Sequence, residues 1–160
     1  MNFIQMQALN NITDILNNFL EPFECYAVPA SDFAYYIASN RITYALAVSD
    51  KHEKTFMNFV HDLFPDIKAD VFLWGFLHEL GHHETEDDFE DDDWKFYYSK
   101  LRQKFDNDYD YYNLPIERAA TEWAGRYMIN HTKEIKSLWN KLVPAIKNFC
   151  KMMEVENDET

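Results

Sequence analysis

Five consecutive residues near the middle of the chain, His78-Glu79-Leu80-Gly81-His82, match the pattern HExxH. On a helix, residues four apart lie one turn above each other, so His78 and His82 can offer two imidazole nitrogens to one metal ion. Glu79 lies about 100° further around the helix, where its carboxylate can reach a metal-bound water without binding the metal. The pattern predicts a zinc ion held by His78 and His82, with Glu79 as the general base that activates the water.

Two other interpretations of this motif have to be weighed. A short pattern can arise by chance, and the histidines could be structural residues of the core. The preceding residues, VFLWGFL, are apolar on nearly all sides of a helix, so the motif is expected on a central, buried helix. Two histidines stacked there would cost free energy without a shared partner, which favours metal binding. Gly75 lies on the same face as the motif, one turn earlier, where its lack of a side chain could leave room for another element.

A catalytic zinc site needs a third protein ligand and an open coordination position. The segment from Pro115 to Ala124 reads PIERAATEWA, and Pro115 suits the first turn of a helix. On such a helix Glu117 lies at the edge of the apolar face, Thr121 lies beside it one turn later, and Glu122 points toward solvent. Glu117 is therefore the predicted third ligand. The alternative is a surface acid that the helix N-terminus stabilises.

The HELGH sequence, followed 35 residues after its last histidine by ExxAxxWA, resembles the ImmA/IrrE-type metallopeptidases, which are small gluzincin-like enzymes of bacteria and their mobile elements. The resemblance covers about residues 40–130. It implies that His78, His82 and Glu117 bind zinc and that Glu79 is the catalytic base. It also implies an intracellular enzyme that cuts a particular protein, often a DNA-binding repressor.

The chain departs from the family pattern in three respects. Thr121 stands where the family usually has Asn or Asp, a residue that can support a ligating histidine. Ala119 stands where the family often has another acid. Some members carry a helix-turn-helix DNA-binding domain, for which these 160 residues leave no length. We therefore expect any repressor partner to be a separate protein.

The rest of the sequence predicts the elements that must position these residues. Helical spacing is expected at residues 2–20, 51–64, 69–83 and 94–105, from Pro115 onward, and in a last helix that Thr132 caps and Pro144 kinks. Residues 24–48 are rich in β-branched and aromatic residues, with a polar turn at Ser39-Asn40-Arg41. The predicted fold is α+β: a small antiparallel β-sheet of two or three strands packed with a mostly α-helical, zincin-like domain. The HExxH motif occupies its central helix.

Length and charge limit the domain organisation and the partners. The 160 residues suit a single metallopeptidase-like domain, with its core at about residues 20–153, an acidic loop at 84–93, a polar loop at 106–113 and a frayed tail at 154–160. A net charge of −13 disfavours nucleic acids and anionic membranes as partners and favours a basic protein or peptide. Two cysteines without a CxxC pair, and an N-terminus without a signal-like apolar run, predict a cytoplasmic location.

Some features of the sequence leave the choice of residue open. A peptidase needs a donor that stabilises the oxyanion, and the candidates are Tyr111, Tyr112, Arg126, Tyr127 and His131. His83 is a fallback metal ligand, although it lies about 100° around the helix from His82. The sheet edge near residues 42–48 could hold an extended peptide by strand addition, or it could simply close the core.

Three functions fit these residues, each on the same fold. The leading one is an intracellular zinc-dependent endopeptidase of narrow specificity, with one Zn²⁺ per chain, that hydrolyses a peptide bond in a regulatory protein. The second is a non-catalytic or metal-free binding module that recognises such a regulator. The third is a zinc hydrolase acting on a small molecule. Substitution of Glu79 by Gln separates the first two, because it should abolish proteolysis while the metal is retained.

Overall fold

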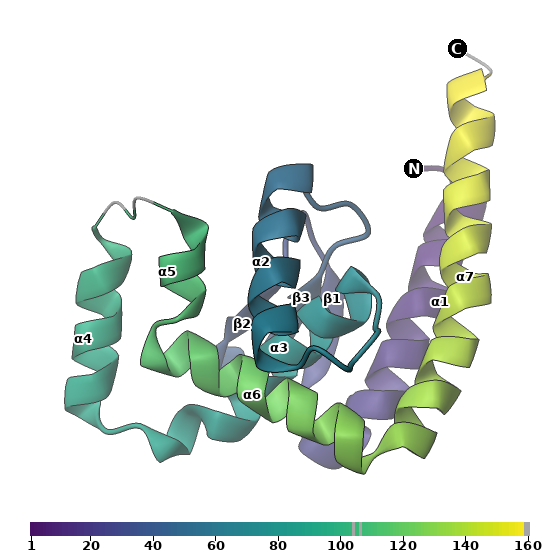
Figure 1. Cartoon of the computed structure of the whole chain (residues 1–160). Coiled ribbons are helices and arrows are strands. Elements are labelled where there is room, and N and C mark those ends of the chain that lie inside the picture. The colour runs from purple at the N-terminus through teal and green to yellow at the C-terminus, as the bar shows by residue number, and fades with distance from the viewer. Residues whose placement is uncertain (104, 106, 159–160) are drawn as a thin grey trace.

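The computed structural model describes the chain except residues 104, 106, 159 and 160 (Figure 1). Its helices and strands in chain order are α1 (Phe3–Leu20), β1 (Tyr26–Pro29), β2 (Ala34–Tyr36), β3 (Arg41–Tyr44), α2 (Asp50–Leu63), α3 (Val71–Thr85), α4 (Asp91–Leu101), α5 (Asp108–Tyr112), α6 (Pro115–Asn130) and α7 (Thr132–Asp158). Short 3₁₀ turns lie at Glu21–Phe23, Ile37–Ser39 and Glu86–Asp88. The predicted α+β class is confirmed, because a small sheet accompanies a mostly helical chain.

The sheet is mixed, and the prediction of an antiparallel sheet is wrong for one of its two strand pairs. Its order is β1-β3-β2, with β1 parallel and β2 antiparallel to β3. The 3₁₀ turn Ile37–Ser39, which ends at Asn40 with a φ of +49°, reverses the chain between β2 and β3 and makes that pair antiparallel. β3 then inserts between the two earlier strands, which no local pattern indicates. Residues 42–44 therefore lie in the central strand, and the two edges of the sheet are β1 and β2.

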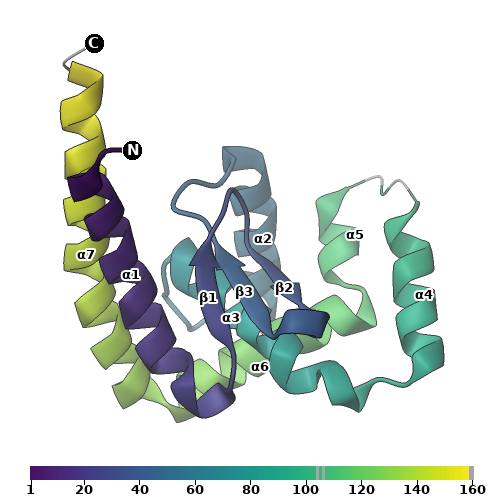
Figure 2. The same cartoon turned by 180° about the vertical axis from the view of Figure 1, so that it is seen from behind.

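The helix α3 runs through the middle of the molecule, between the sheet and α6 (Figures 1 and 2). Asp70 caps its N-terminus by accepting a hydrogen bond from the backbone N–H of Phe72 at 2.8 Å. Almost every residue from Phe72 to His82 is buried, as predicted from its apolar sequence. The helices α1 and α7 lie side by side at one end of the molecule, and α4 and α5 lie at the other (Figure 2).

The acidic run at residues 84–93 is not the predicted loop. Glu84 lies in the last turn of α3, Glu86–Asp88 form a 3₁₀ turn, and Asp91–Asp93 make the first turn of α4. Acidic residues are stabilised at a helix N-terminus by its dipole, and the backbone N–H of Glu90 donates to Asp93 at 2.9 Å. A helix therefore begins earlier than its first apolar residue suggests.

Three further boundaries differ from the prediction. The predicted loop at 106–113 contains the short helix α5. Thr132 is the first residue of α7, and its hydroxyl donates to the α6 carbonyls of Met128 and Ile129 instead of capping α7. The helix α7 contains Pro144 and continues to Asp158, within the predicted frayed tail, whose last two residues lie outside the described part. In the described part of the chain, no helix is long and apolar enough to cross a membrane.

Candidate metal centre

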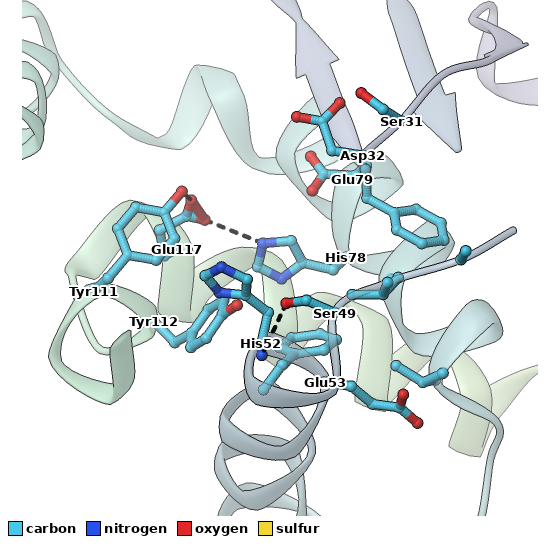
Figure 3. Close-up of a pocket in the computed structure, with 16 residues that line it drawn as sticks. Ser31, Asp32, Ser49, His52, Glu53, His78, Glu79, Tyr111, Tyr112 and Glu117 are labelled. Atoms are coloured by element: carbon cyan, nitrogen blue, oxygen red, sulfur yellow. Dashed lines mark hydrogen bonds and ion pairs between the residues drawn. The ribbon is translucent and has the colours of Figure 1, made fainter. Parts of the chain in front are cut away.

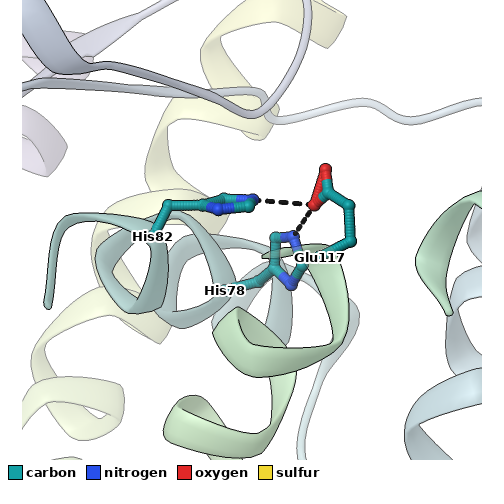
Figure 4. Close-up of side chains that lie close together, drawn as sticks. All are labelled: His78, His82 and Glu117. Carbon is teal, nitrogen blue, oxygen red and sulfur yellow. Dashed lines mark hydrogen bonds and ion pairs between the residues drawn. The ribbon is translucent and has the colours of Figure 1, made fainter. Parts of the chain in front are cut away.

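Two helices bring His78, His82 and Glu117 together, and His78 and Glu117 line a cavity there (Figure 3). The histidines come from consecutive turns of α3, and the glutamate comes from the first turn of α6. Glu117 Oε2 lies 3.0 Å from His78 Nε2 and 2.7 Å from His82 Nε2 (Figure 4). All three side chains are buried, and their ligand atoms lie within 4.8 Å of one another. The group could hold a metal ion.

A close approach of α3 and α6 at Gly81 creates this arrangement. A methyl group at Gly81 would lie 3.0 Å from the carbonyl carbon of Ala120 and would overlap its carbonyl oxygen. Gly81 precedes His82 in α3, and Ala120 follows Glu117 by one turn of α6. The absence of a side chain at Gly81 therefore lets Glu117 reach across both histidines.

Thr121 lies one turn after Glu117, where the sequence analysis placed it, and it contacts His78. Its Oγ1 is 2.9 Å from His78 Nδ1, and the side chain is completely buried. With a metal on Nε2 of His78, Nδ1 would carry the ring proton and donate it to the Thr121 hydroxyl. Such a bond fixes both the tautomer and the orientation of a metal-binding imidazole.

Two tyrosines hold the other oxygen of the Glu117 carboxylate. Tyr97 of α4 donates its hydroxyl hydrogen to Glu117 Oε1 at 3.1 Å, and Tyr111 of α5 donates to the same oxygen. The sequence does not predict a role for Tyr97, and it offers Tyr111 only as a possible oxyanion donor. In the sequence of α4, Trp94, Tyr97, Tyr98 and Leu101 stand at helical spacing and mark one face of the helix, but this pattern does not distinguish Tyr97 from Tyr98 or show what that face packs against.

The charges at the centre are coupled through Glu117. Burial alone raises the pKa of Glu117, but the charge of His82 and the hydrogen bonds from both histidines hold it well below its ordinary value. Burial lowers the pKa of His82, but the adjacent Glu117 carboxylate outweighs it and raises the pKa to about 9. In the absence of a metal, the centre therefore holds an anionic carboxylate against imidazole groups. A cation could replace the shared protons, because metal binding requires neutral imidazoles and releases protons.

Glu79 lies beside the ligand group and faces two cavities that meet there. One cavity has a volume of about 430 Å³ and is lined by Val48, Glu53 and Phe56 as well as by the site. The other, of about 710 Å³, lies between β2 and α4. Glu79, Glu117 and Tyr111 line both cavities. Desolvation by burial raises the pKa of Glu79 in spite of the nearby histidines, so its carboxyl group retains a proton more readily than an exposed one.

The remaining candidates are spread over the molecule. His83 is bonded at both ring nitrogens, Nε2 to the carbonyl of Phe23 and Nδ1 to the Tyr35 hydroxyl, each at 2.8 Å, which leaves neither nitrogen for a metal. Tyr111 and Tyr112 line the smaller cavity. Tyr127 stacks on His131 with ring centroids 4.0 Å apart, and it packs against Phe19 and Phe23.

Two further predicted residues of α6, Glu122 and Arg126, lie away from the histidines. Arg126 is exposed and lies 3.9 Å from Glu122. Glu122 points away from the centre and pairs with Arg118 at 2.9 Å, as its predicted orientation toward solvent requires. Of the two α6 glutamates, Glu117 is therefore the one that faces the histidines.

Comparison with known proteins adds no identification. No protein-family model matches the chain, and no curated protein and no solved structure matches it. The nature of the metal, the activity and the partner must therefore be inferred from the geometry and chemistry of the site.

Proposed function

We propose that this protein is a zinc-dependent endopeptidase of narrow specificity that cuts a regulatory protein in the cytoplasm, on a zincin-like fold of the ImmA/IrrE type. The observation that carries the proposal is the convergence of His78, His82 and Glu117 next to Glu79 at the junction of two cavities. HExxH matches are common, but a chance match would not be expected to meet a buried carboxylate 35 residues later in the chain.

The donor set favours zinc. Two imidazole nitrogens and one carboxylate oxygen are a known protein ligand set of catalytic zinc, which keeps a further position for water or substrate. Thr121 on His78 adds the outer hydrogen bond that orients a ligating imidazole. Imidazole also suits iron, nickel and copper, so the identity of the metal is a separate result of the experiment below.

The residues of the site then have separate roles in peptide hydrolysis. When bound, zinc would lower the pKa of a water molecule and polarise the peptide carbonyl. Glu79 removes the proton of the attacking water and passes it to the leaving amine. The raised pKa of the Glu79 carboxyl group, which desolvation by burial causes, brings its proton affinity closer to that required at neutral pH. The cavities on the two sides of Glu79 accommodate the chain before and after the cleaved bond.

The charge of the molecule supports a basic substrate. The net charge is −13, and Asp32 and Glu53 line the smaller cavity together with the apolar Val48 and Phe56. Such a surface attracts cationic segments over a range of about 8–10 Å at ordinary ionic strength. A basic regulatory protein, presented as an extended segment, fits both the charge and the shape.

One observation favours the alternative, a binding module without catalysis. Glu117 accepts hydrogen bonds from both histidines, so the buried polar groups satisfy each other without a metal. A metal-free protein could keep this fold and recognise a regulator through the same cavities.

Metal content tests the proposal first. Elemental mass spectrometry of the purified protein should give about one zinc per chain, strongly reduced in His78→Ala and Glu117→Ala. Glu122→Ala is the matched control, because Glu122 lies on the same helix and is paired with Arg118 at the surface. A protein that takes up no divalent metal after reloading would exclude the metallopeptidase and leave the binding module.

Proteolysis tests the second step. The zinc-loaded protein should generate new N-termini in an extract of basic cellular proteins, as measured by N-terminal labelling and mass spectrometry. Glu79→Gln should retain zinc and lose cleavage by about 10²–10⁴-fold, the usual contribution of a general base. Equal cleavage by both proteins would exclude Glu79 as the base.

A further inference from the structure

We propose that Tyr97 and Tyr111 are positioning residues of the metal centre, which hold the Glu117 carboxylate so that one oxygen alone faces the metal. This inference rests on the metal centre proposed above. It adds a second ring of hydrogen bonds, contributed by α4 and α5, to the ligands contributed by α3 and α6.

The two carboxylate oxygens of Glu117 have different hydrogen-bond partners. Oε2 lies within 3.0 Å of both histidine Nε2 atoms. Oε1 accepts hydrogen bonds from Tyr97 at 3.1 Å and from Tyr111, and the two hydroxyls reach it from different helices. The last torsion of a glutamate side chain is broad, so an unrestrained carboxylate would present either oxygen or both. Two donors on Oε1 fix that torsion.

The hydroxyls also compensate the burial of the carboxylate. Glu117 is only 2% exposed, and an oxygen of a buried carboxylate without a donor would be costly. Hydrogen bonds to a charged acceptor are worth about 1.5–3 kcal/mol, more than bonds between neutral groups. Because neither hydroxyl contacts Oε2, the compensation leaves that oxygen available to a cation.

The two tyrosines come from two helices that contain no fully buried residue. Every residue of α4 is at least partly exposed, and α5 is only five residues long. Tyr97 lies where α4 meets the start of α6, and Tyr111 lies six residues before Glu117. These helices therefore reach the buried centre through hydroxyl groups, and metal occupancy and the position of α4 should influence each other reciprocally.

Zinc affinity, measured by competition with a chromophoric chelator, tests the proposal directly. Tyr97→Phe and Tyr111→Phe keep the rings and remove only the hydroxyls. We expect each to weaken zinc binding by about tenfold and the double variant by up to about 100-fold, the range found for partners of metal ligands. The visible spectrum of the Co²⁺-substituted protein should change as well, because it reports the coordination geometry.

Two matched controls identify effects that do not pass through Glu117. Tyr98→Phe alters the exposed neighbour of Tyr97 on α4. Tyr109→Phe removes a hydroxyl of α5 that donates to another carboxylate, that of Asp62 on α2. Both controls should keep the zinc affinity of the unmodified protein, and all variants should show the same far-UV circular dichroism.

The outcomes separate this inference from the proposed function. If the unmodified protein binds zinc, and the double variant binds it equally well with the same Co²⁺ spectrum, the positioning role is excluded and the metal centre stands. If Tyr109→Phe weakens zinc binding as much as Tyr111→Phe does, the effect is a general loss of packing and the inference is also wrong. If the unmodified protein binds no metal, the proposed function itself fails.

Discussion

Two pairs of helices meet at the Glu117 carboxylate, and they are built differently. The pair α3 and α6 is packed tightly: 12 residues of the 15-residue α3 are buried, and α3 touches the backbone of α6 at Gly81. The pair α4 and α5 lies at one end of the molecule, with an acidic first turn and a mainly exposed surface. Both pairs nevertheless contact the Glu117 carboxylate with polar groups. The imidazoles of α3 lie at Oε2, and the hydroxyls of α4 and α5 donate to Oε1.

We infer from this difference that the position and the orientation of the proposed ligands have separate structural origins. Backbone packing decides where His78, His82 and Glu117 lie, so a change there should alter the fold and the metal site together. Hydroxyl groups from the peripheral pair decide which oxygen of Glu117 faces the histidines. A change among them should alter metal binding without moving the packed backbone, and each lost hydrogen bond to the charged carboxylate should lower the free energy of unfolding by about 1.5–3 kcal/mol.

Substitution of Gly81 by Ala should have the largest effect. The added methyl group would overlap the Ala120 carbonyl oxygen, which is backbone and cannot turn away. Overpacking of a core typically costs about 1–3 kcal/mol and sometimes more, which exceeds the roughly 1 kcal/mol that Ala gains over Gly in a helix. Urea denaturation in the presence of a chelator measures the free energy of unfolding without a contribution from metal.

Gly75→Ala is the control for this substitution. A methyl group there would lie 3.2 Å from the Phe33 ring, a side chain that can shift by a few tenths of an ångström. Its free energy of unfolding should stay within about 1 kcal/mol of the unmodified protein. If Gly81→Ala is as stable as Gly75→Ala, the close approach of α3 and α6 does not determine the stability of this pair.

Thr121→Val should have the next largest effect, and the effect should fall on metal affinity. Valine has nearly the same shape as threonine, but it lacks the oxygen that lies 2.9 Å from His78 Nδ1. Loss of a partner of this kind usually weakens metal binding by about 10–100-fold. Chelator competition measures the change, and Thr121→Ser, which keeps the hydroxyl, should restore most of the affinity. Equal affinities in Val and Ser variants would show that the hydroxyl does not orient His78.

The packed pair is also the part that the sequence predicts well. The apolar residues from Val71 to Leu77 indicate a buried helix, and Pro115 marks the start of the next one. Helical periodicity then separates Glu117 from Glu122, because the two carboxylates lie on different faces of α6. These inferences need only local geometry, which a single sequence contains.

The remaining features depend on contacts between distant segments. The parallel pairing of β1 with β3 follows from the insertion of β3 between two earlier strands. The contact of Tyr97 with Glu117 depends on where α4 lies, and the helical spacing of its aromatic residues does not indicate which element that face packs against. The sequence therefore predicts the proposed ligands but not the groups that orient them.

Phe96→Ala should have the smallest effect. The Phe96 side chain is 49% exposed on α4, next to Tyr97 in sequence. Substitutions at such surface positions usually change the free energy of unfolding by less than about 0.5 kcal/mol. Urea denaturation and chelator competition should both give values close to those of the unmodified protein. If Phe96→Ala and Tyr97→Phe weaken zinc binding equally, α4 acts through its packing as a whole. If only Tyr97→Phe weakens it, the hydroxyl group of Tyr97, and not the packing of α4, connects this helix to the centre.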